Sequence, residues 1–409
     1  MRQSFFILLD IDGVLIKPGG YRQSFINTVN YFLAFFGQPH LSVDESIAEK
    51  FEFAGIQAEW DMVPLAVAAF FDWYAGTTRR TEPFESIQLA ENMLPVGNQD
   101  DFIGFLNGKI MDYSKIPVSD EIYPQAVYRH CRQAGEASVL PRIWDDGILA
   151  EILSDPLNVY HSVLFRRLEN EVLGSKVFHE TFGFQPEADL PSNLEKLDEP
   201  LISKHYRDKI ADLNGSGGRA AILTARPNLL PDTVKRDTVI SHTILPEAEM
   251  ARRAIGWTND QMIIIGVGTL CYMEEKYNLR KDAYLKPHPY HALAAILCKI
   301  CENQLDALEL AKKTFDLWER KDFSVNPLAP VWPMDNPIRL GVFEDSVSGI
   351  KSCLAAADIL RTFGYTVTAE PYGIATTVDK NTLLASMSAP VFPDINAALD
   401  VFFSRESEK

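Results

Sequence analysis

The stretch FFILLDIDGVL, residues 5–15, joins a fully apolar run to two carboxylates. A short run that is apolar at every position is typical of a strand covered on both faces in a parallel sheet. Asp10 and Asp12 follow this run, and residues two apart in an extended chain point to the same side. Gly13 can then adopt a conformation that turns the backbone. We therefore expect a central strand that presents both acids where it leaves the core.

Three further short apolar runs have the same character, at residues 220–223, 262–265 and 340–343. Other strand candidates follow at residues 365–368 and 372–376 and near Val391. Several such runs in one chain predict an α/β protein with a parallel sheet. In an open sheet of this kind, ligands bind beyond the carboxyl ends of the strands.

The long segment between the first two runs predicts a separate, mostly α-helical domain. Apolar residues recur at helical spacing over residues 22–36, 42–53, 58–74, 120–132 and 144–153. Ser42 and Glu45 match a capping box at one helix start. A helix over residues 201–213 then leads through a flexible GSGG into the second strand. We therefore place the inserted domain at residues 19–195 and a discontinuous core at residues 1–18 and 196–409.

Two later segments, residues 313–337 and 357–381, are expected to be insertions in the core. The first contains NPLAPVWPMDNP, in which four prolines in twelve residues favour a loop. The C-terminal SRESEK is expected to fray.

Composition limits the partners of this chain. Its 409 residues suit more than one domain, and its net charge of −17 argues against nucleic acid or an anionic membrane as a partner. No apolar run approaches the ~20 residues of a membrane span, and the N-terminal run is too short for a signal peptide. The five cysteines are irregularly spaced and suggest no disulfide framework. We expect a cytoplasmic protein.

Polar side chains also follow the other predicted strands. Thr224, Ala225 and Arg226 come after the second run, Lys286 lies in the segment beyond the third, and Glu344 and Asp345 come after the fourth. Several carboxylates in one cleft need a cation, and oxygen ligands favour Mg²⁺. A carboxylate, Mg²⁺, a lysine and a hydroxyl donor suit phosphoryl transfer.

Four motifs in this order resemble those of the haloacid dehalogenase (HAD) superfamily: DIDGV (10–14), LTARP (223–227), LKPHP (285–289) and FEDSVSGIKS (343–352). FEDSVSG with KPHP is similar to the phosphatase and β-phosphoglucomutase-like subgroup. The resemblance implies a Rossmann-like three-layer core with a C1-type helical cap inserted between the first two motifs. The helical block occupies that place but is larger than the family leads us to expect.

The resemblance implies different roles for the two acids of the first motif. Asp10 would be the nucleophile and a metal ligand. Asp12 would be the general acid and base, and would give the metal its backbone carbonyl. An acid at this second position favours phosphate-ester chemistry over dehalogenation, because a halide leaves without a proton.

The resemblance also implies roles for the remaining motifs. Thr224, with Ala225 beside it, would bind the phosphoryl oxygens, and Lys286 would offset the charge of Asp10 and the phosphate. Asp345 would complete the metal site, with Glu344 acting directly or through water. The alternatives are helix capping by Thr224, Glu344 or Asp345, and an ordinary surface position for Lys286.

Substrate contacts are expected from Arg226, Glu59 and Trp60. Arg226 could touch a substrate anion or the cap, or form a surface ion pair. Glu59 and Trp60 belong to FAGIQAEWDM, residues 53–62, a segment that faces the substrate in cap-bearing relatives; the alternative is Trp60 packed into the helical domain.

Zinc is not expected at the nearby histidines and cysteines. The spacing of His288, His291, Cys298 and Cys301 matches no tetrahedral zinc pattern. Cys298 and Cys301 are expected on one face of a helix, where cysteine behaves as a small apolar residue.

The sequence thus predicts a Mg²⁺-dependent hydrolase that cleaves a small phosphate monoester through an aspartyl-phosphate intermediate. A phosphomutase acting on a sugar phosphate would use the same motifs, and the cap would decide between the two. A non-enzymatic binding protein on the same scaffold is the alternative from another class.

Overall fold

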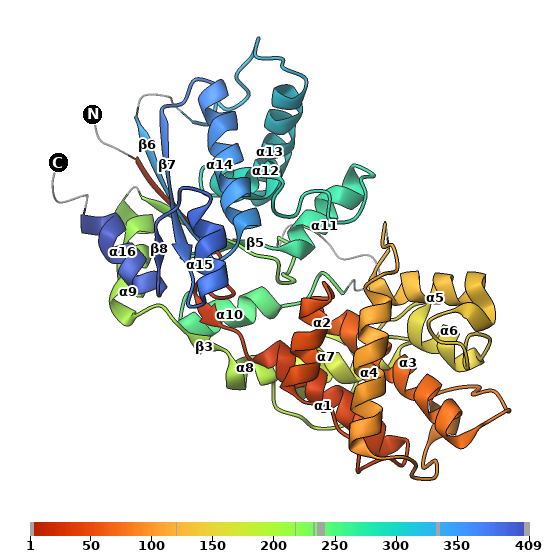
Figure 1. Cartoon of the computed structure of the whole chain (residues 1–409). Helices are drawn as coiled ribbons and strands as arrows, with labels where there is room; N and C mark the ends of the chain where they lie inside the picture. Colours follow the sequence, from red (N-terminus) through yellow and green to blue (C-terminus); the bar gives the residue numbers. More distant parts are fainter. Residues whose placement is uncertain are drawn as a thin grey trace. The chain divides into compact units, whose positions relative to one another are not determined.

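The computed structural model describes residues 4–119, 121–216, 218–231, 234, 242–332 and 336–404. Its contacts divide the chain into two compact units (Figure 1). The core unit is Met1–Pro18 with Asp198–Lys409, and the helical unit is Gly19–Leu197. The sequence placed the second boundary two residues earlier, at residue 195.

The core unit contains a six-stranded sheet in the order β5-β4-β1-β6-β7-β8, and every neighbouring pair is parallel. Its strands are β1 (Ser4–Leu9), β4 (Arg219–Leu223), β5 (Ile263–Ile265), β6 (Ile338–Glu344), β7 (Val367–Ile374) and β8 (Val391–Phe392). The predicted α/β class and parallel sheet are confirmed. The two candidates at residues 365–368 and 372–376 belong to the single strand β7.

A short antiparallel ribbon joins the two places where the chain passes between the units. It pairs β2 (Ile16–Lys17) with β3 (Glu199–Pro200), and the Leu201 N–H also donates to the Leu15 carbonyl at 2.9 Å. This ribbon was not predicted, because strands of two residues leave no periodic pattern.

Eight helices of the core unit complete its described elements: α9 (Lys204–Ser216), α10 (Glu247–Ile255), α11 (Val267–Lys276), α12 (Pro289–Leu297), α13 (Gln304–Glu319), α14 (Val347–Thr362), α15 (Val378–Ala385) and α16 (Ile395–Ser404). The expected insertions at residues 313–337 and 357–381 need correction. The first begins inside α13, and the second spans the end of α14, β7 and the start of α15. The latter therefore belongs to the regular alternation of helix and strand.

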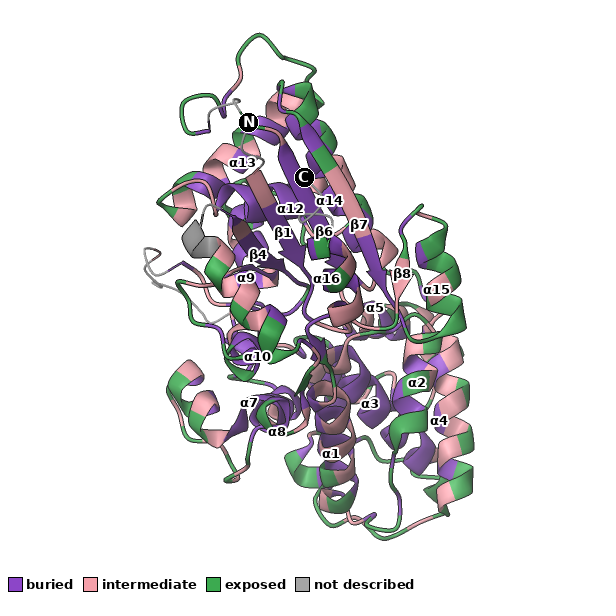
Figure 2. Cartoon of the chain, turned by 90° about the vertical axis from the view of Figure 1, so that its left-hand side faces the viewer, coloured by how far each residue is buried: buried purple, intermediate pink, exposed green. Residues whose placement is uncertain are grey.

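Helices cover both faces of the sheet (Figure 1). Phe6 and Leu8 of β1 pack with residues of α12, α13 and α14, whereas Ile7 and Leu9 pack with residues of α9, α10 and α16. Figure 2 shows β1, β4 and β6 as buried. The unbroken apolar run that opens the chain is therefore explained by a strand that has no solvent-facing side.

The helical unit consists of α1 (Gly20–Phe35), α2 (Glu45–Phe53), α3 (Glu59–Thr78), α4 (Gln99–Tyr113), α5 (Tyr123–Ala134), α6 (Gly147–Leu153), α7 (Val163–Phe182), α8 (Asn193–Leu197) and two 3₁₀ turns, η1 (Gln88–Ala90) and η2 (Gly135–Ala137). Helix α3 is buried along most of its length and packs against α1, α4 and α6 (Figure 2). The sequence missed α4 and α7, which contain glycines; Gly174 breaks α7 with a φ of +75°.

The predicted capping box at Ser42 is wrong. Helix α2 begins at Glu45, and Asp44 is its N-cap, with a carboxylate that accepts the Ser46 N–H at 3.0 Å. The Ser42 N–H instead donates to Gln99 Oε1 of α4 at 2.8 Å. Asp44, the residue directly before the helix, therefore takes the capping role.

Parts of four expectations lie outside the described residues: the start of the helix at residue 120, the middle of the GSGG segment, residues 333–335 of the proline-rich loop and residues 405–409 of the tail. Among the helices that the structure does describe, none is long and apolar enough to cross a membrane.

Candidate active site

The ends of β1 and β6 meet where the strand order of the sheet reverses. From β1 the chain goes to β4 and then β5 on one side, and afterwards returns to β6, β7 and β8 on the other. The register pairs Leu9 with Phe343, and the Asp10 N–H donates to the Phe343 carbonyl at 3.1 Å. Asp10 therefore lies beside Glu344, at the kind of reversal where open α/β sheets bind ligands.

Lys286 bridges these two neighbouring carboxylates. Its Nζ lies 3.0 Å from Asp10 Oδ1 and 2.7 Å from Glu344 Oε1, and all three side chains are almost entirely buried. The Ile11 N–H also donates to Asp10 Oδ1 at 2.8 Å. The ends of β1 and β6 and the segment before α12 thus bring together three groups that are far apart in the sequence.

Burial and mutual repulsion shift the pKa values of these groups. Burial, followed by the charge of Glu344, raises the pKa of Asp10 well above its ordinary value. Burial also raises the pKa of Glu344, although Lys286 opposes it. Burial alone would lower the pKa of Lys286, but the charges of Asp10 and Glu344 outweigh it and raise that pKa. One ammonium does not compensate two buried carboxylates.

The turn after β6 fixes Glu344 and aims Asp345 at the same place. Ser346 is the N-cap of α14, where its Oγ accepts the Gly349 N–H at 3.1 Å and donates to Glu344 Oε2 at 3.0 Å. A Cβ at Gly349 would collide with the Glu344 carboxylate, and one at Gly13 would collide with that of Asp345. The alternative that Glu344 or Asp345 caps this helix is therefore wrong, because Ser346 takes that position.

Asp10, Glu344 and Asp345 each offer an oxygen, and these oxygens lie within 4.8 Å of one another. Asp345 also pairs with Lys380 of α15. Asp12 was predicted to give the metal its backbone carbonyl, and this stays a prediction; its carboxylate pairs with Arg226.

The donor chemistry of this group fits one hard divalent cation. Its three carboxylates, Asp10, Glu344 and Asp345, are in contact with two ammonium groups, Lys286 and Lys380. The cluster therefore keeps an excess of negative charge, and its donors are all oxygens, as Mg²⁺ prefers. Burial is the largest cause of the raised pKa values of Asp10 and Glu344, and a cation between the three oxygens would counter both that cost and the repulsion from neighbouring carboxylates.

Arg226 lies inside the core unit. Its guanidinium holds Asp12 through Nε and Nη2, at 2.9 and 2.5 Å, and its Nη1 lies 2.8 Å from Asp198 Oδ2. The Arg226 side chain is only 2% exposed, which contradicts the surface ion pair considered from the sequence.

Thr224 and Ala225 form the turn between β4 and Arg226. Thr224 is fully buried, and its Oγ1 accepts the Arg226 N–H at 3.1 Å, whereas Ala225 is exposed. Thr224 caps no helix, since the next described helix is α10. The Thr224 hydroxyl therefore shapes the turn at the end of β4.

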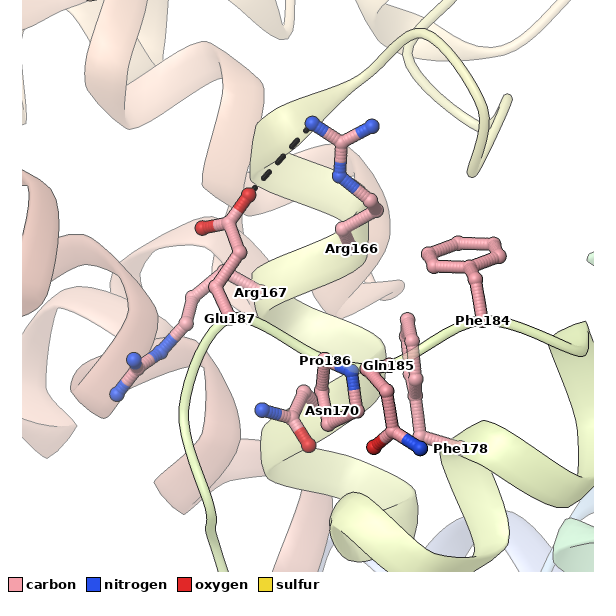
Figure 3. Close-up of a pocket in the computed structure, with 8 residues that line it drawn as sticks. All are labelled: Arg166, Arg167, Asn170, Phe178, Phe184, Gln185, Pro186 and Glu187. Carbon is pink, nitrogen blue, oxygen red and sulfur yellow. Dashed lines mark ion pairs between the residues drawn. The ribbon is translucent and has the colours of Figure 1, made fainter.

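Glu59 and Trp60 are the first two residues of α3 in the helical unit, and both are half-buried. The same unit contains a cavity of about 180 Å³ between α7 and the segment that follows it (Figure 3). Its two arginines are already paired: Arg166 with Glu187 at 3.6 Å, and Arg167 with Glu171 at 2.5 Å. No predicted site residue lines this cavity.

The histidines and cysteines near Lys286 have structural roles. His288 is the N-cap of α12, and the buried His291 bonds to the Ile265 carbonyl through Nε2 at 2.8 Å. Cys298 is the C-cap residue of α12, and Cys301 lies beyond the helix, so the predicted shared helical face is wrong. The side chain of Cys298 is buried in the core.

Sequence reasoning missed two charged residues of the site, Asp198 and Lys380. Asp198 reaches Arg226 only because the β2–β3 ribbon returns the chain to the core unit. Lys380 reaches Asp345 from α15, 35 residues further along the chain. Neither residue follows a strand in a recognisable motif, so no sequence signal marked it.

Comparison of the chain with the profiles of known protein families, with curated proteins and with solved structures found no match.

Proposed function

We propose that this protein is a Mg²⁺-dependent phosphatase of the HAD type, which hydrolyses a small phosphate monoester. The observation that carries the proposal is the buried Asp10–Lys286–Glu344 arrangement with Asp345 beside it, at the reversal point of a parallel sheet. In this proposal the core unit is a Rossmann-like domain, and the helical unit is an enlarged cap that selects the substrate.

The residues of this chain divide the proposed chemistry between them. Asp10 attacks phosphorus, the bond to the ester oxygen breaks, and Asp12 gives that oxygen its proton. Asp12 then takes a proton from water as the water attacks the aspartyl-phosphate, which releases phosphate and restores Asp10. Asp10, Glu344 and Asp345 would hold the Mg²⁺, which when bound neutralises charge on the transferring phosphoryl group.

Lys286 keeps the nucleophile in place throughout these steps. Its ammonium contacts Asp10 and Glu344 together, so it limits repulsion between them and can also face a phosphoryl oxygen. Thr224 lies at the adjacent strand end, where a hydroxyl donor to the phosphoryl oxygens is expected.

The test is phosphate release from a panel of phosphate monoesters, measured with Mg²⁺ and after chelation. We expect the wild-type protein to hydrolyse at least one ester, to stop when the metal is removed, and to recover when Mg²⁺ is restored. Asp10→Asn should remove turnover while its circular dichroism remains that of the wild type. Asp358→Asn, an exposed substitution on α14, should keep the activity.

Other outcomes would redirect the proposal. Conversion of a sugar phosphate into its isomer without phosphate release would indicate a phosphomutase. Absence of both Mg²⁺ binding and hydrolysis across the panel would indicate a non-enzymatic binding protein.

A further inference from the structure

Arg226 connects the proposed acid to the segment at which the chain re-enters the core unit. The Nε–H donates to Asp12 Oδ1 and Oδ2 at 3.1 and 2.9 Å, and Nη2 donates to Asp12 Oδ1 at 2.5 Å. The Nη1 atom lies 2.8 Å from Asp198 Oδ2. Arg226 and Asp198 are nearly inaccessible, at 2% and 1% side-chain exposure, whereas Asp12 is 37% exposed. Of these three paired side chains, Asp12 is therefore the one accessible from outside the protein.

The backbone of Arg226 is fixed from two sides. Its N–H donates to Thr224 Oγ1 at 3.1 Å, and its carbonyl accepts the Val267 N–H at 3.1 Å. Gly266 makes this approach possible, because a Cβ there would lie 2.6 Å from the Arg226 carbonyl oxygen. The guanidinium is therefore presented from a rigid turn between β4 and the start of α11.

The ribbon fixes the two carboxylates. Asp12 forms a bridge with Ile16, and the Gly13 N–H donates to the Ile16 carbonyl at 2.8 Å. Ile16 pairs with Pro200 across the ribbon, two residues beyond Asp198. One small unit of backbone thus carries both carboxylates, and Arg226 ties them together.

We propose that Arg226 is a positioning residue for Asp12, anchored by Asp198, and that it is not a ligand of the substrate phosphate. A guanidinium fork with two nitrogens on one carboxylate fixes the orientation of that carboxylate, which a single ammonium does not. Its third nitrogen, Nη1, faces Asp198. All three nitrogens of the guanidinium thus already contact carboxylates, where a phosphate would otherwise bind. This inference rests on the proposed phosphatase function and deepens it.

The consequence concerns the transfer of the proton to the leaving group. When Asp10 attacks phosphorus, the departing alkoxide must take the proton of Asp12, and a misplaced Asp12 leaves it unprotonated. An alkyl leaving group depends strongly on this proton, whereas 4-nitrophenolate leaves readily without it. A substitution that disturbs only the position of Asp12 therefore affects an alkyl ester more than an aryl ester.

The experiment measures kcat/KM of Arg226→Gln for an alkyl phosphate found by the substrate panel and for 4-nitrophenyl phosphate. This constant reports the steps up to transfer of the phosphoryl group, so slow hydrolysis of the intermediate does not obscure it. We expect the loss on the alkyl ester to exceed that on the aryl ester by at least about tenfold, which is less than the whole 10²–10⁴-fold effect of general acid catalysis because Asp12 itself is retained. Asp12→Asn should show the same selectivity, and Asp198→Asn a weaker form of it.

Equal losses on the two esters, with the whole effect in KM, would show that Arg226 binds phosphate and would overturn the inference. Unchanged kinetics in Arg226→Gln would also overturn it. Should that variant fail to fold, Arg226→Lys and Asp198→Asn carry the same comparison. Wild-type turnover that depends on Asp10 establishes the proposed function independently, so failure of the ester ratio leaves that function intact.

Discussion

Lys286 shows how one side chain makes a buried acidic site possible. The carboxylates of Asp10 and Glu344 both contact Lys286, so they lie close together. Two carboxylates so placed repel each other strongly when water is excluded. The ammonium offsets part of that repulsion, and the remaining negative charge favours a divalent cation. The motif around Lys286 was recognisable from the sequence, but its simultaneous contact with both acids depends on the register between β1 and β6.

Lys380 is a second cation beside these acids, and it forms an ion pair with Asp345. A Mg²⁺ would use this carboxylate too, so the lysine competes with the metal for it. We expect Lys380→Gln to bind Mg²⁺ more tightly, by up to about fivefold, which corresponds to the energy of a partly exposed ion pair. Isothermal titration calorimetry with Mg²⁺ measures this. Lys313→Gln, an equal charge change on α13, should leave the affinity unchanged, and weaker binding by Lys380→Gln would contradict the prediction.

Glu249 of α10 gives a prediction on pH. Its Oε1 accepts the Leu229 N–H at 3.1 Å, and its Oε2 is buried without a hydrogen-bond partner among the described residues. Burial raises the pKa of Glu249 from 4.5 to about 7, against the opposing effects of backbone hydrogen bonds, Arg252 and Arg253. The folded state therefore holds this proton more tightly than the unfolded state does. Its stabilising effect is complete below about pH 4.5 and is lost as the pH rises through about 7.

Glu249→Gln removes that pH-dependent contribution. We expect the variant to be more stable than the wild type at pH 8, by up to about 3 kcal/mol, and to lose that advantage at pH 4.5. Urea unfolding at the two pH values measures the difference. The exposed Glu302→Gln is the matched control. A difference that is the same at both pH values would show that the proton on Glu249 is not involved.

At the scale of the element, the strand ends and the first turn of α14 carry most of the site. The strands could be predicted because each is apolar on both faces, and the positions of their carboxyl ends followed from the sheet. The contacts of Arg226 could not be predicted, because the two-residue ribbon that brings Asp198 to it has no sequence pattern. The cap of α2 was misassigned for a local reason: Asp44 and Ser42 are both good caps, but the helix begins at Glu45, so only Asp44 stands in the N-cap position.

The first turn of α14 gives a test at this scale. A Cβ at Gly349 would collide with the carboxylate of Glu344, so Gly349→Ala must displace either the helix or the acid. We expect a loss of about 1–3 kcal/mol of unfolding free energy, typical of overpacking, together with weaker Mg²⁺ binding. Thermal unfolding with and without Mg²⁺ measures both effects.

Gly108→Ala is the matched control for this substitution. Gly108 lies in α4, and a Cβ added there would meet no heavy atom within 4 Å, so the change should be neutral or stabilise by up to about 1 kcal/mol. Equal stability and equal Mg²⁺ response in the two variants would contradict the role assigned to the turn.

At the scale of the whole molecule, the proposed function assigns chemistry to the core unit and substrate selection to the helical unit. The predicted catalytic and metal-binding residues all belong to the core unit, whereas Glu59 and Trp60 belong to the helical unit. The sequence revealed this division because strands and helices have different apolar periods. Helices α4 and α7 were missed although the buried Phe102, Leu106 and Ile110 of α4 recur at helical spacing; only α7 is broken, at Gly174. Nor did the sequence indicate which substrate the helical unit would admit.

The central claim is that the carboxylate of Asp10 carries the phosphoryl group during turnover. The most direct measurement is a rapid acid quench of the enzyme during turnover of its best ester, followed by mass spectrometry of the intact chain and its peptides. We predict one added phosphoryl group on the peptide that contains Asp10, dependent on Mg²⁺ and absent from Asp10→Asn. A phosphoryl group on another residue, or substantial Mg²⁺-dependent turnover by Asp10→Asn, would contradict the account.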